Sequence, residues 1–219
     1  MNTPLESGNI WFARSDSFGD KMECVMIKDL QEDIPNFKEI EARKKRNLIS
    51  CFHVGNKETL AFWDTYAKTD TERRKFALRF DRVELISRIE SAESIEILEK
   101  SVPNIKSIVH GKVIYKNLIG TKKENLSKKK VLYPAFRKEY AFAYEREYRF
   151  VISLKKGSSS LGFGLNIGKL EDIDFSILVN PLLETDDYIN CIKTIKESKF
   201  GTHLNMSVLT KWIKPELWK

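Results

Sequence analysis

Hydrophobic residues fall into short alternating runs and longer runs with helical spacing, which predict both strands and helices. The expected strands are 10–13, 48–54, 75–80, 107–115, 145–154, 161–167, 175–179 and 204–209. The expected helices follow Asp33 and Pro35, span 57–68, run from Asp81 towards Pro103, begin at Pro134 and span 186–198. No repeat or linker separates them. We therefore expect an α+β fold in a single domain over residues 1–219, with a mixed, mostly antiparallel sheet flanked by helices.

The spacing within these elements also predicts which side chains are buried. Strand 48–54 and the helix after it are the most apolar part of the chain, so we expect Phe52 and Trp63 to be largely buried. In the 186–198 helix the inward positions are expected to be Ile189, Ile192 and Ile195. Segment 155–160, Lys-Lys-Gly-Ser-Ser-Ser, is the clearest turn.

Composition and charge narrow the class of protein. Of 219 residues, 42% are hydrophobic and 11% aromatic, which excludes a disordered chain. The net charge of +7 favours anionic partners, and nucleic acid is the partner we expect for the basic surface. The run Arg43–Arg46 has two interpretations: cations that complement a helix dipole, or contacts to nucleic acid. Lys128–Lys130 are expected on an exposed or mobile segment.

The cysteines and the N-terminus predict where the protein works. Cys24, Cys51 and Cys191 are widely spaced and odd in number, which predicts a reducing, cytoplasmic setting without disulfides. No apolar leader opens the sequence and no apolar run could span a bilayer, so we expect no membrane partner. The three histidines form no metal-ligand spacing with the cysteines, and no metal cofactor is expected.

Standard motifs for nucleotide binding and hydrolysis are missing. There is no GxxxxGK[ST] sequence and no GxSxG sequence. Gly162, Gly164 and Gly168 are one residue too widely spaced for a dinucleotide-binding loop, so we interpret them as turns and an irregular strand.

The most suggestive chemistry lies at the start of the 145–154 strand. Alternation places Glu145, Glu147 and Arg149 on one face, with an apolar face opposite. Two carboxylates and a guanidinium in this pattern can orient a sugar hydroxyl or stabilise a developing cation. The alternative is a solvated strand face with cross-strand ion pairs. We expect the two glutamates to line a pocket with Asp20 or Glu23 and an aromatic residue from helix 60–67.

An aromatic stripe on the 57–68 helix has two interpretations as well. Helical spacing places Trp63 and Ala67 on one face, with Phe62 and Tyr66 on an adjoining one. Such stripes usually belong to a core, and the alternative is a stacking wall for nicotinamide or a nucleobase.

Five segments in this order resemble the bacterial domain-of-unknown-function family 2971. They are Ile10–Ala13 (IWFA), Phe18–Glu23 (FGDKME), Ser50–His53 (SCFH), Phe62–Ala67 (FWDTYA) and Ala141–Arg149 (AFAYEREYR). The resemblance covers residues 8–210. Departures from the family pattern are Gly19 and Lys21 in the loop, His53 in place of serine and Tyr148 in place of tryptophan.

The resemblance carries functional expectations. Members of the family occur among mobile elements and phage-defence genes, which implies an effector with a protein partner in a defence system. The motif order also has a weaker fold-level likeness to ADP-ribosyltransferases, which implies NAD as substrate. Glu147 and Glu145 are then the expected catalytic residues. Substrate contacts are expected from Arg14, Asp20, Glu23, His53, Trp63, Tyr66 and Arg149.

Two other functions stay open. In a non-catalytic nucleic-acid or partner-binding domain, the glutamates and Arg149 form a structural cluster, and Lys122, Lys123 and Lys128–Lys130 contact phosphates. In a metal-dependent nuclease, Asp20, Glu23, Glu145 and Glu147 hold Mg²⁺. The sequence lacks a lysine placed beside these carboxylates as in a nuclease motif, which weakens the nuclease hypothesis.

Overall fold

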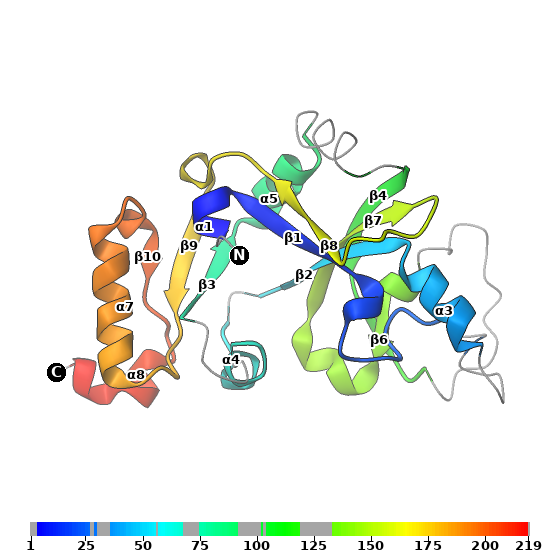
Figure 1. Ribbon diagram of the computed structural model, residues 1–219. Coiled ribbons are helices and arrows are strands. Elements are labelled where there is room, and N and C mark those ends of the chain that lie inside the picture. Colours follow the sequence, from blue (N-terminus) through cyan, green and yellow to red (C-terminus); the bar gives the residue numbers. More distant parts are fainter. Residues whose placement is uncertain are drawn as a thin grey trace. The chain divides into compact units, whose positions relative to one another are not determined.

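A computed structural model describes residues 4–26, 29, 36–55, 57–67, 75–91, 102, 104–118 and 133–218. The chain folds into two compact units, each made of two stretches (Figure 1). Unit 1 comprises 1–54 and 91–167, and unit 2 comprises 55–90 and 168–219. Mostly antiparallel sheets with accompanying helices confirm the predicted α+β class. The expectation of one domain over the whole chain stays a prediction.

Unit 1 is built around a five-stranded sheet. Its helices and strands are α1 (Pro4–Ser7), β1 (Asn9–Arg14), η1 (Ser15–Ser17), α3 (Phe37–Lys44), β2 (Asn47–His53), β4 (Ile105–Lys112), β5 (Ile114–Lys116), η3 (Tyr133–Phe136), β6 (Arg137–Glu139), η4 (Tyr140–Glu145), β7 (Glu147–Leu154) and β8 (Gly162–Asn166). The strand order is β4-β7-β2-β1-β8, and every pairing in this sheet is antiparallel. The short strands β5 and β6 form a separate parallel pair.

Strand β7 is buried along its whole length. It lies between β4 and β2, and all eight of its residues are buried. One face carries Tyr148, Phe150 and Ile152, as the alternation predicts. The other face carries Glu147 and Arg149, which are buried too. Glu147 and Arg149 therefore do not form the solvated strand face of the alternative interpretation, because other parts of unit 1 cover them.

A close approach at the edge strand β8 explains one glycine. A Cβ atom at Gly162 would lie 2.3 Å from Cζ2 of Trp11 and 2.6 Å from the carbonyl oxygen of Phe12. Glycine is therefore required for the indole of Trp11 to lie over this strand, where the residue stays 48% exposed.

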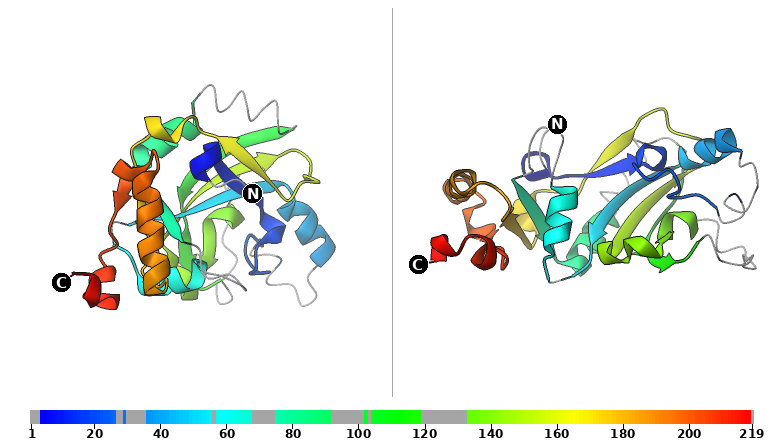
Figure 2. Two further views of the ribbon diagram at one scale, coloured as in Figure 1. Left: turned by 60° about the vertical axis from the view of Figure 1, so that its left-hand side comes forward. Right: turned by 90° about the horizontal axis from the view of Figure 1, so that it is seen from below.

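Unit 2 contains a three-stranded sheet of order β10-β9-β3 with helices around it. Its elements are α4 (Leu60–Tyr66), β3 (Phe76–Phe80), α5 (Arg82–Ile89), η5 (Leu170–Asp172), β9 (Phe175–Val179), α7 (Thr185–Glu197), η6 (Gly201–His203), β10 (Leu204–Asn205), α8 (Thr210–Ile213) and η7 (Pro215–Trp218). In Figure 2, α7 lies alongside β9 and β10. Its inward residues are Tyr188, Cys191 and Ile195. Ile189 is exposed, which corrects the expected inward position.

Local capping explains several helix starts. Asp81 accepts hydrogen bonds from the amides of Val83 and Glu84, as the capping-box pattern predicts. Helix α4 is shorter than expected and begins after Thr59, whose side chain accepts from the amide of Phe62. The helical positions beyond 91 that were expected before Pro103 lie outside the described residues.

The largest difference from the sequence prediction lies at 133–145. In place of a helix with Phe136, Tyr140 and Ala143 at helical spacing, the chain forms η3, strand β6 and η4. In a continuous helix over this segment, the helical repeat would set the direction of the Lys138 side chain. The observed path instead directs it into the charged groups of β7. Ion pairs of Lys138 with Glu145 and Glu147 therefore override local propensity here.

The remaining expectations concern the last strand, two aromatic residues, the cysteines and membrane-spanning helices. Strand β10 covers only the first two residues of the expected 204–209 strand. Phe52 is half-buried rather than largely buried, whereas Trp63 is buried. The three cysteines are free. Among the described residues, no helix is both long and apolar enough to cross a membrane.

Trp63→Ala is expected to lower the free energy of unfolding by roughly 3–5 kcal/mol. The indole is 7% exposed, packs with Ala67 and Leu178, and donates to Glu58 Oε2 at 3.0 Å. Trp212→Ala is the control, because Trp212 is 85% exposed and its truncation leaves no cavity. Urea denaturation of both variants tests this assignment, and equal midpoints for Trp63→Ala and the wild type would contradict it.

Candidate functional site

Five charged side chains meet inside unit 1 and are called here the charged cluster: Glu23, Lys138, Glu145, Glu147 and Arg149. They come from the loop after β1, from β6, from η4 and from β7. All five are buried, and three carboxylates face two cations. Burial of charges is tolerated only where each one is paired, so the contacts within this cluster decide its structure.

Arg149 is the centre of the charged cluster. It has 0% exposure, and its guanidinium contacts three segments. Its Nε donates to Glu147 Oε2 at 2.6 Å, its Nη1 donates to the carbonyl oxygen of Ala135 at 2.9 Å, and its Nη2 donates to Glu23 Oε1. A planar guanidinium can make all three bonds in one plane, which a lysine cannot do. Arg149 thereby links β7 to η3 and to the loop after β1.

Lys138 is the second cation of the cluster. Its Nζ donates to Glu145 Oε2 at 2.5 Å and to Glu147 Oε1 at 3.1 Å, and it lies 3.6 Å from Glu23 Oε2. The ammonium also lies 4.8 Å from the centroid of the Phe142 ring. Lys138 therefore contacts all three carboxylates, and its pKa is raised: burial opposes the charge, but the hydrogen bond to Glu145 and the neighbouring carboxylates outweigh it.

The two glutamates of the E-x-E sequence converge although only one lies in the strand. Glu145 ends η4, Glu147 begins β7, and Arg146 between them has the left-handed backbone conformation, with φ of 45°. This turn brings both carboxylates to Lys138. Alternation predicted both glutamates on one strand face, whereas in the structure the turn at Arg146 brings their carboxylates together.

Glu147 is held as an anion. Burial alone would raise the pKa of this carboxyl, but the hydrogen bond from Arg149 and the nearby Lys138 lower it from the usual 4.5 to about 2. Its backbone N–H donates to the Tyr115 hydroxyl at 2.8 Å. Burial raises the pKa of Tyr115 to about 12, so this hydroxyl stays neutral. The carboxylate is thus charged and fixed in orientation at neutral pH.

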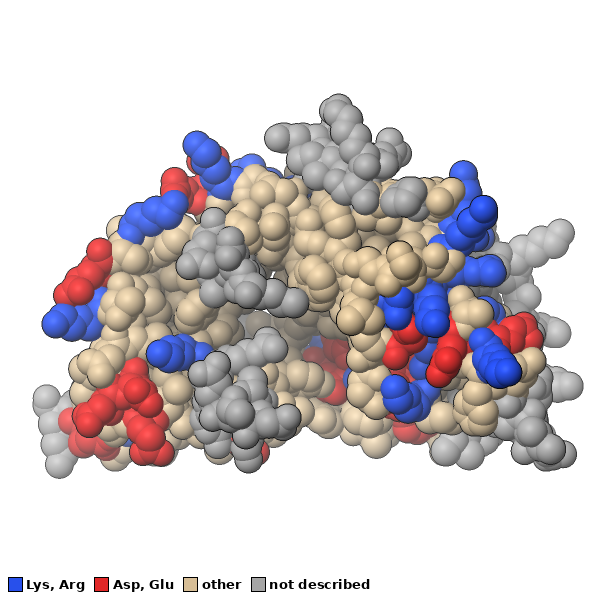
Figure 3. Space-filling model, viewed as in Figure 1, with Lys and Arg blue, Asp and Glu red and all other residues tan. Residues whose placement is uncertain are grey.

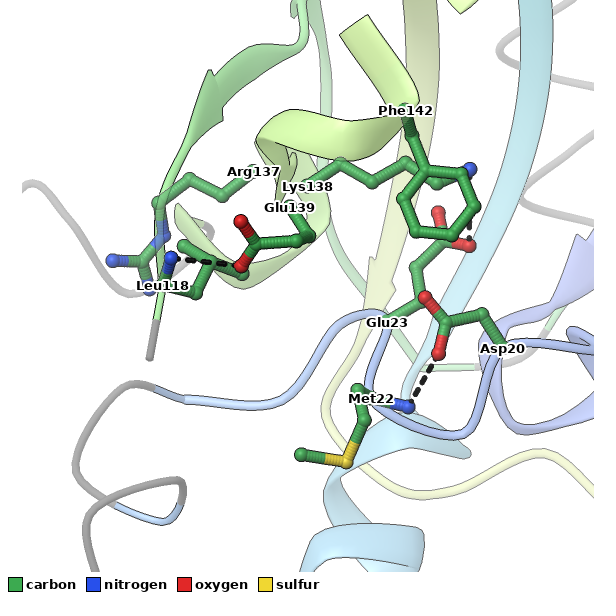
Figure 4. A pocket seen from close by; sticks show the side chains of 8 residues that line it. All are labelled: Asp20, Met22, Glu23, Leu118, Arg137, Lys138, Glu139 and Phe142. Carbon is green, nitrogen blue, oxygen red and sulfur yellow. Dashed lines mark hydrogen bonds and ion pairs between the residues drawn. The ribbon is translucent and has the colours of Figure 1, made fainter. Parts of the chain in front are cut away.

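A cavity of about 180 Å³ lies next to the charged cluster. Its lining residues include Asp20, Glu23, Lys138 and Phe142 (Figure 4), together with Met22, Leu118, Arg137 and Glu139. Asp20 accepts from the amide of Met22 at 2.8 Å, which fixes this loop. Enclosed ligand sites usually measure at least about 300 Å³, so this cavity suits a small group rather than a whole dinucleotide.

The outcome for the expected pocket is mixed. Asp20 and Glu23 line the cavity, and an aromatic residue does too, but that residue is Phe142 from η4. Glu145 and Glu147 do not line it and are 2% and 8% exposed. The cluster is also not the flat, solvated strand face of the alternative interpretation.

The surface nearest to Glu147 lies on strand β2. The register pairs Cys51 with Arg149 and His53 with Glu147, so these four side chains share one sheet face. Cys51 is exposed and its thiol hydrogen-bonds to the Glu147 carboxylate, whereas His53 Nδ1 lies 2.7 Å from the Glu145 carbonyl oxygen. Cys51 and His53 therefore lie beside the charged cluster on the same face of the sheet.

Three other predicted site residues, Arg14, Trp63 and Tyr66, contact residues outside the charged cluster. Arg14 forms an ion pair with Asp16 at 2.6 Å, and its Nη1 donates to the carbonyl oxygens of Ser158, Ser159 and Ser160. Trp63 and Tyr66 belong to unit 2, where Trp63 is in the core and Tyr66 is exposed, with its ring 4.6 Å from that of Phe62. Lys122, Lys123 and Lys128–Lys130 lie outside the described residues.

Sequence reasoning missed Lys138 and Phe142. Both lie in the segment that was expected to be a helix, where a lysine would point to solvent. The signal in the sequence is the run Arg137-Lys138-Glu139, three consecutive charged residues close to the E-x-E sequence. In the structure, Arg137 and Lys138 of this run are buried. A buried cation close to an E-x-E sequence is the partner those carboxylates need.

Arg149→Met is expected to lower the free energy of unfolding by about 3–5 kcal/mol, because three buried carboxylates are left with one cation. Arg82→Met on α5 is the control, since Arg82 is exposed. Chemical denaturation of the two variants at neutral pH gives the comparison. A cost below 1 kcal/mol for Arg149→Met would show that the cluster contributes little to stability.

Acid is expected to destabilise the protein through Glu147. Its pKa is lowered in the folded state, so its stabilisation is complete above about pH 4.5 and is lost as the pH falls towards 2. The contribution is about 3 kcal/mol. Urea denaturation at several pH values between 6 and 3 should give a smaller loss for Glu147→Gln than for the wild type. Glu41→Gln, which changes an exposed carboxylate, should keep the wild-type pH dependence.

Comparison with protein-family models, with curated proteins and with solved structures finds no match to this chain. The resemblance to family 2971 and the likeness to ADP-ribosyltransferases therefore stay predictions that rest on the motifs quoted above.

Proposed function

We propose that the protein is an ADP-ribosyltransferase-like effector that cleaves NAD, with Glu147 as the central catalytic residue. The observation that carries this proposal is the state of the Glu147 carboxylate. It is anionic, with a pKa of about 2, and it is oriented by Arg149 and Lys138 beside the exposed residue Cys51. A prearranged anion of this kind stabilises positive charge that develops in a transition state.

The chemistry that fits this carboxylate is rupture of the N-glycosidic bond of NAD. The electron pair of that bond leaves with the nicotinamide nitrogen, and positive charge develops on the ribose, as in glycoside cleavage. Glu147 stabilises that charge. Attack by a hydroxyl or amine of an acceptor, or by water, then forms the new bond to the ribose and releases a proton. Glu145, beside Glu147 and held by Lys138, is the expected group for orienting the acceptor.

The strand order supports the proposal at the level of topology. The likeness to ADP-ribosyltransferases requires an early polar strand, an aromatic segment and a late E-x-E strand. In unit 1 the early strand β1 and strand β7, which begins at Glu147, are both neighbours of β2 in one sheet. Residues at the ends of these strands therefore lie within about 10 Å of one another across the sheet.

The structure changes the roles that we assign to two arginines. Arg149 has no exposed surface and contacts Glu147 directly, so we assign it as a positioning residue rather than a pyrophosphate ligand. The guanidinium of Arg14 is occupied by Asp16 and by the 158–160 carbonyls, so it holds this loop in place. Neither arginine is offered as a contact to NAD.

One observation favours the nuclease hypothesis. The lysine that the sequence motif lacks is supplied by Lys138, which contacts Glu23, Glu145 and Glu147. The same contacts weigh against that hypothesis, because the carboxylate oxygens that would bind Mg²⁺ accept from Lys138 and Arg149 instead. No group of three metal-ligating side chains occurs among the residues that the structure describes.

The test is release of labelled nicotinamide from NAD in the presence of mixed RNA, DNA and protein. Wild-type protein should release nicotinamide, and Glu147→Gln should be slower by roughly 100-fold or more. Near-ultraviolet circular dichroism at the assay temperature establishes that the variant is folded. Folded Glu147→Gln with near wild-type release would contradict the catalytic assignment. Absence of release by the wild type would favour the binding-domain function, and degradation of the nucleic acid only with Mg²⁺ would favour the nuclease.

A further inference from the structure

Five cations gather at one end of the five-stranded sheet and are called here the basic edge: Lys45, Arg46, Lys106, Lys155 and Lys156. Strand β2 begins after Lys45 and Arg46, β7 ends just before Lys155, and β4 begins at Ile105. Since β7 pairs antiparallel with both β2 and β4, these three strand ends are neighbours. The fold thus brings together cations from three distant parts of the sequence.

Backbone hydrogen bonds hold the basic edge in place. The N–H of Leu154 donates to the Arg46 carbonyl oxygen at 2.8 Å, and that of Lys155 donates to the Asn104 carbonyl oxygen at 2.8 Å. The N–H of Ser158 donates to the Lys45 carbonyl oxygen at 2.9 Å, which ties the 155–160 loop to the start of β2. These bonds use only main-chain atoms of Lys45, Arg46 and Lys155, so replacement of the side chains leaves the bonding groups in place.

No carboxylate of the described residues forms an ion pair with the basic edge. Three acids of unit 1 have other partners: Arg43 binds Asp29 and Glu39, each at 2.5 Å, and Arg14 binds Asp16. Lys44 is also withdrawn from the surface, because it is buried and donates to the Lys21 carbonyl oxygen. Figure 3 shows Lys and Arg side chains gathered over this end of the sheet, with fewer Asp and Glu among them.

We propose that the basic edge binds the sugar-phosphate backbone of a nucleic acid. Three adjacent strand ends span about 10 Å, so their cations can contact successive phosphates. Lysine and arginine contacts of this kind are independent of sequence and release counterions. The loop beside the edge, 157–160, is Gly-Ser-Ser-Ser, so it places no acidic side chain next to the cations. This inference does not rest on NAD cleavage.

The experiment compares two triple variants by fluorescence anisotropy with labelled single-stranded RNA and duplex DNA over a series of KCl concentrations. Arg46→Gln, Lys155→Gln and Lys156→Gln together neutralise the edge. Lys169→Gln, Lys193→Gln and Lys196→Gln together remove the same charge from exposed positions of unit 2. The edge variant should bind at least tenfold more weakly, with a slope of log K against log salt that is shallower by about 2–3 units. The control variant should keep the wild-type slope.

Three outcomes would overturn the proposal: no binding of either oligonucleotide by the wild type, equal losses in the two triple variants, or binding of phosphatidylserine vesicles without binding of nucleic acid. The failure of this proposal and the failure of the proposed function are distinguishable. The edge variant keeps Glu147 and the charged cluster intact, so nicotinamide release in the absence of nucleic acid should equal that of the wild type.

Discussion

The burial of one guanidinium, that of Arg149, is the constraint on which unit 1 depends. A central strand covered on both faces normally carries apolar side chains only, because an unpaired charge there costs several kcal/mol. Strand β7 carries Arg149 in such a place, and the carboxylates of Glu23 and Glu147 with the carbonyl group of Ala135 compensate it. The loop after β1 and the turn before β6 must therefore lie where they do. Their backbone path follows from the need to pair this charge.

The same constraint gives Glu147 its chemical character. Arg149 and Lys138 fix the carboxylate, so it does not take a proton or rotate freely near neutral pH. Such a group is unsuited to general acid catalysis, which requires a pKa near the working pH. It is suited to electrostatic stabilisation, which requires a permanent charge in a constant orientation. This distinction separates the proposed reaction from hydrolyses that rely on a proton-donating carboxyl.

Charged residues of unit 1 gather in two places, the buried charged cluster and the basic edge. Inside, three carboxylates face two cations, and the cluster carries a net charge of −1 from its five formal charges. At the end of the sheet, five cations have no carboxylate partner among the described residues. Negative formal charge therefore prevails within the charged cluster, and positive charge prevails at the basic edge. A cationic ligand group is favoured near the cluster, and a polyanion at the basic edge.

Hydrophobic periodicity determined most of the strands and the helices α5 and α7, because their apolar positions repeat with the period of the element. It also predicted that Trp63 is buried. The pattern failed at 133–145, where the apolar spacing is helical but the chain is extended or in tight turns. There the ion pairs of Lys138 with residues of β7 and η4 outweigh the local preference.

For the candidate site, strand alternation identified Glu145, Glu147 and Arg149, and the loop Phe18–Glu23 of the family resemblance identified Glu23. It could not show that these groups are buried, because Glu23 and Arg149 are 126 positions apart. It could not show that Lys138 joins them either, because the helical spacing at 133–145 hides the turn that brings Lys138 to Glu145 and Glu147. The tertiary structure decided which cations are paired inside and which remain at the basic edge. The physical reason is that pairing of charges depends on distance in space, whereas a sequence records only distance along the chain.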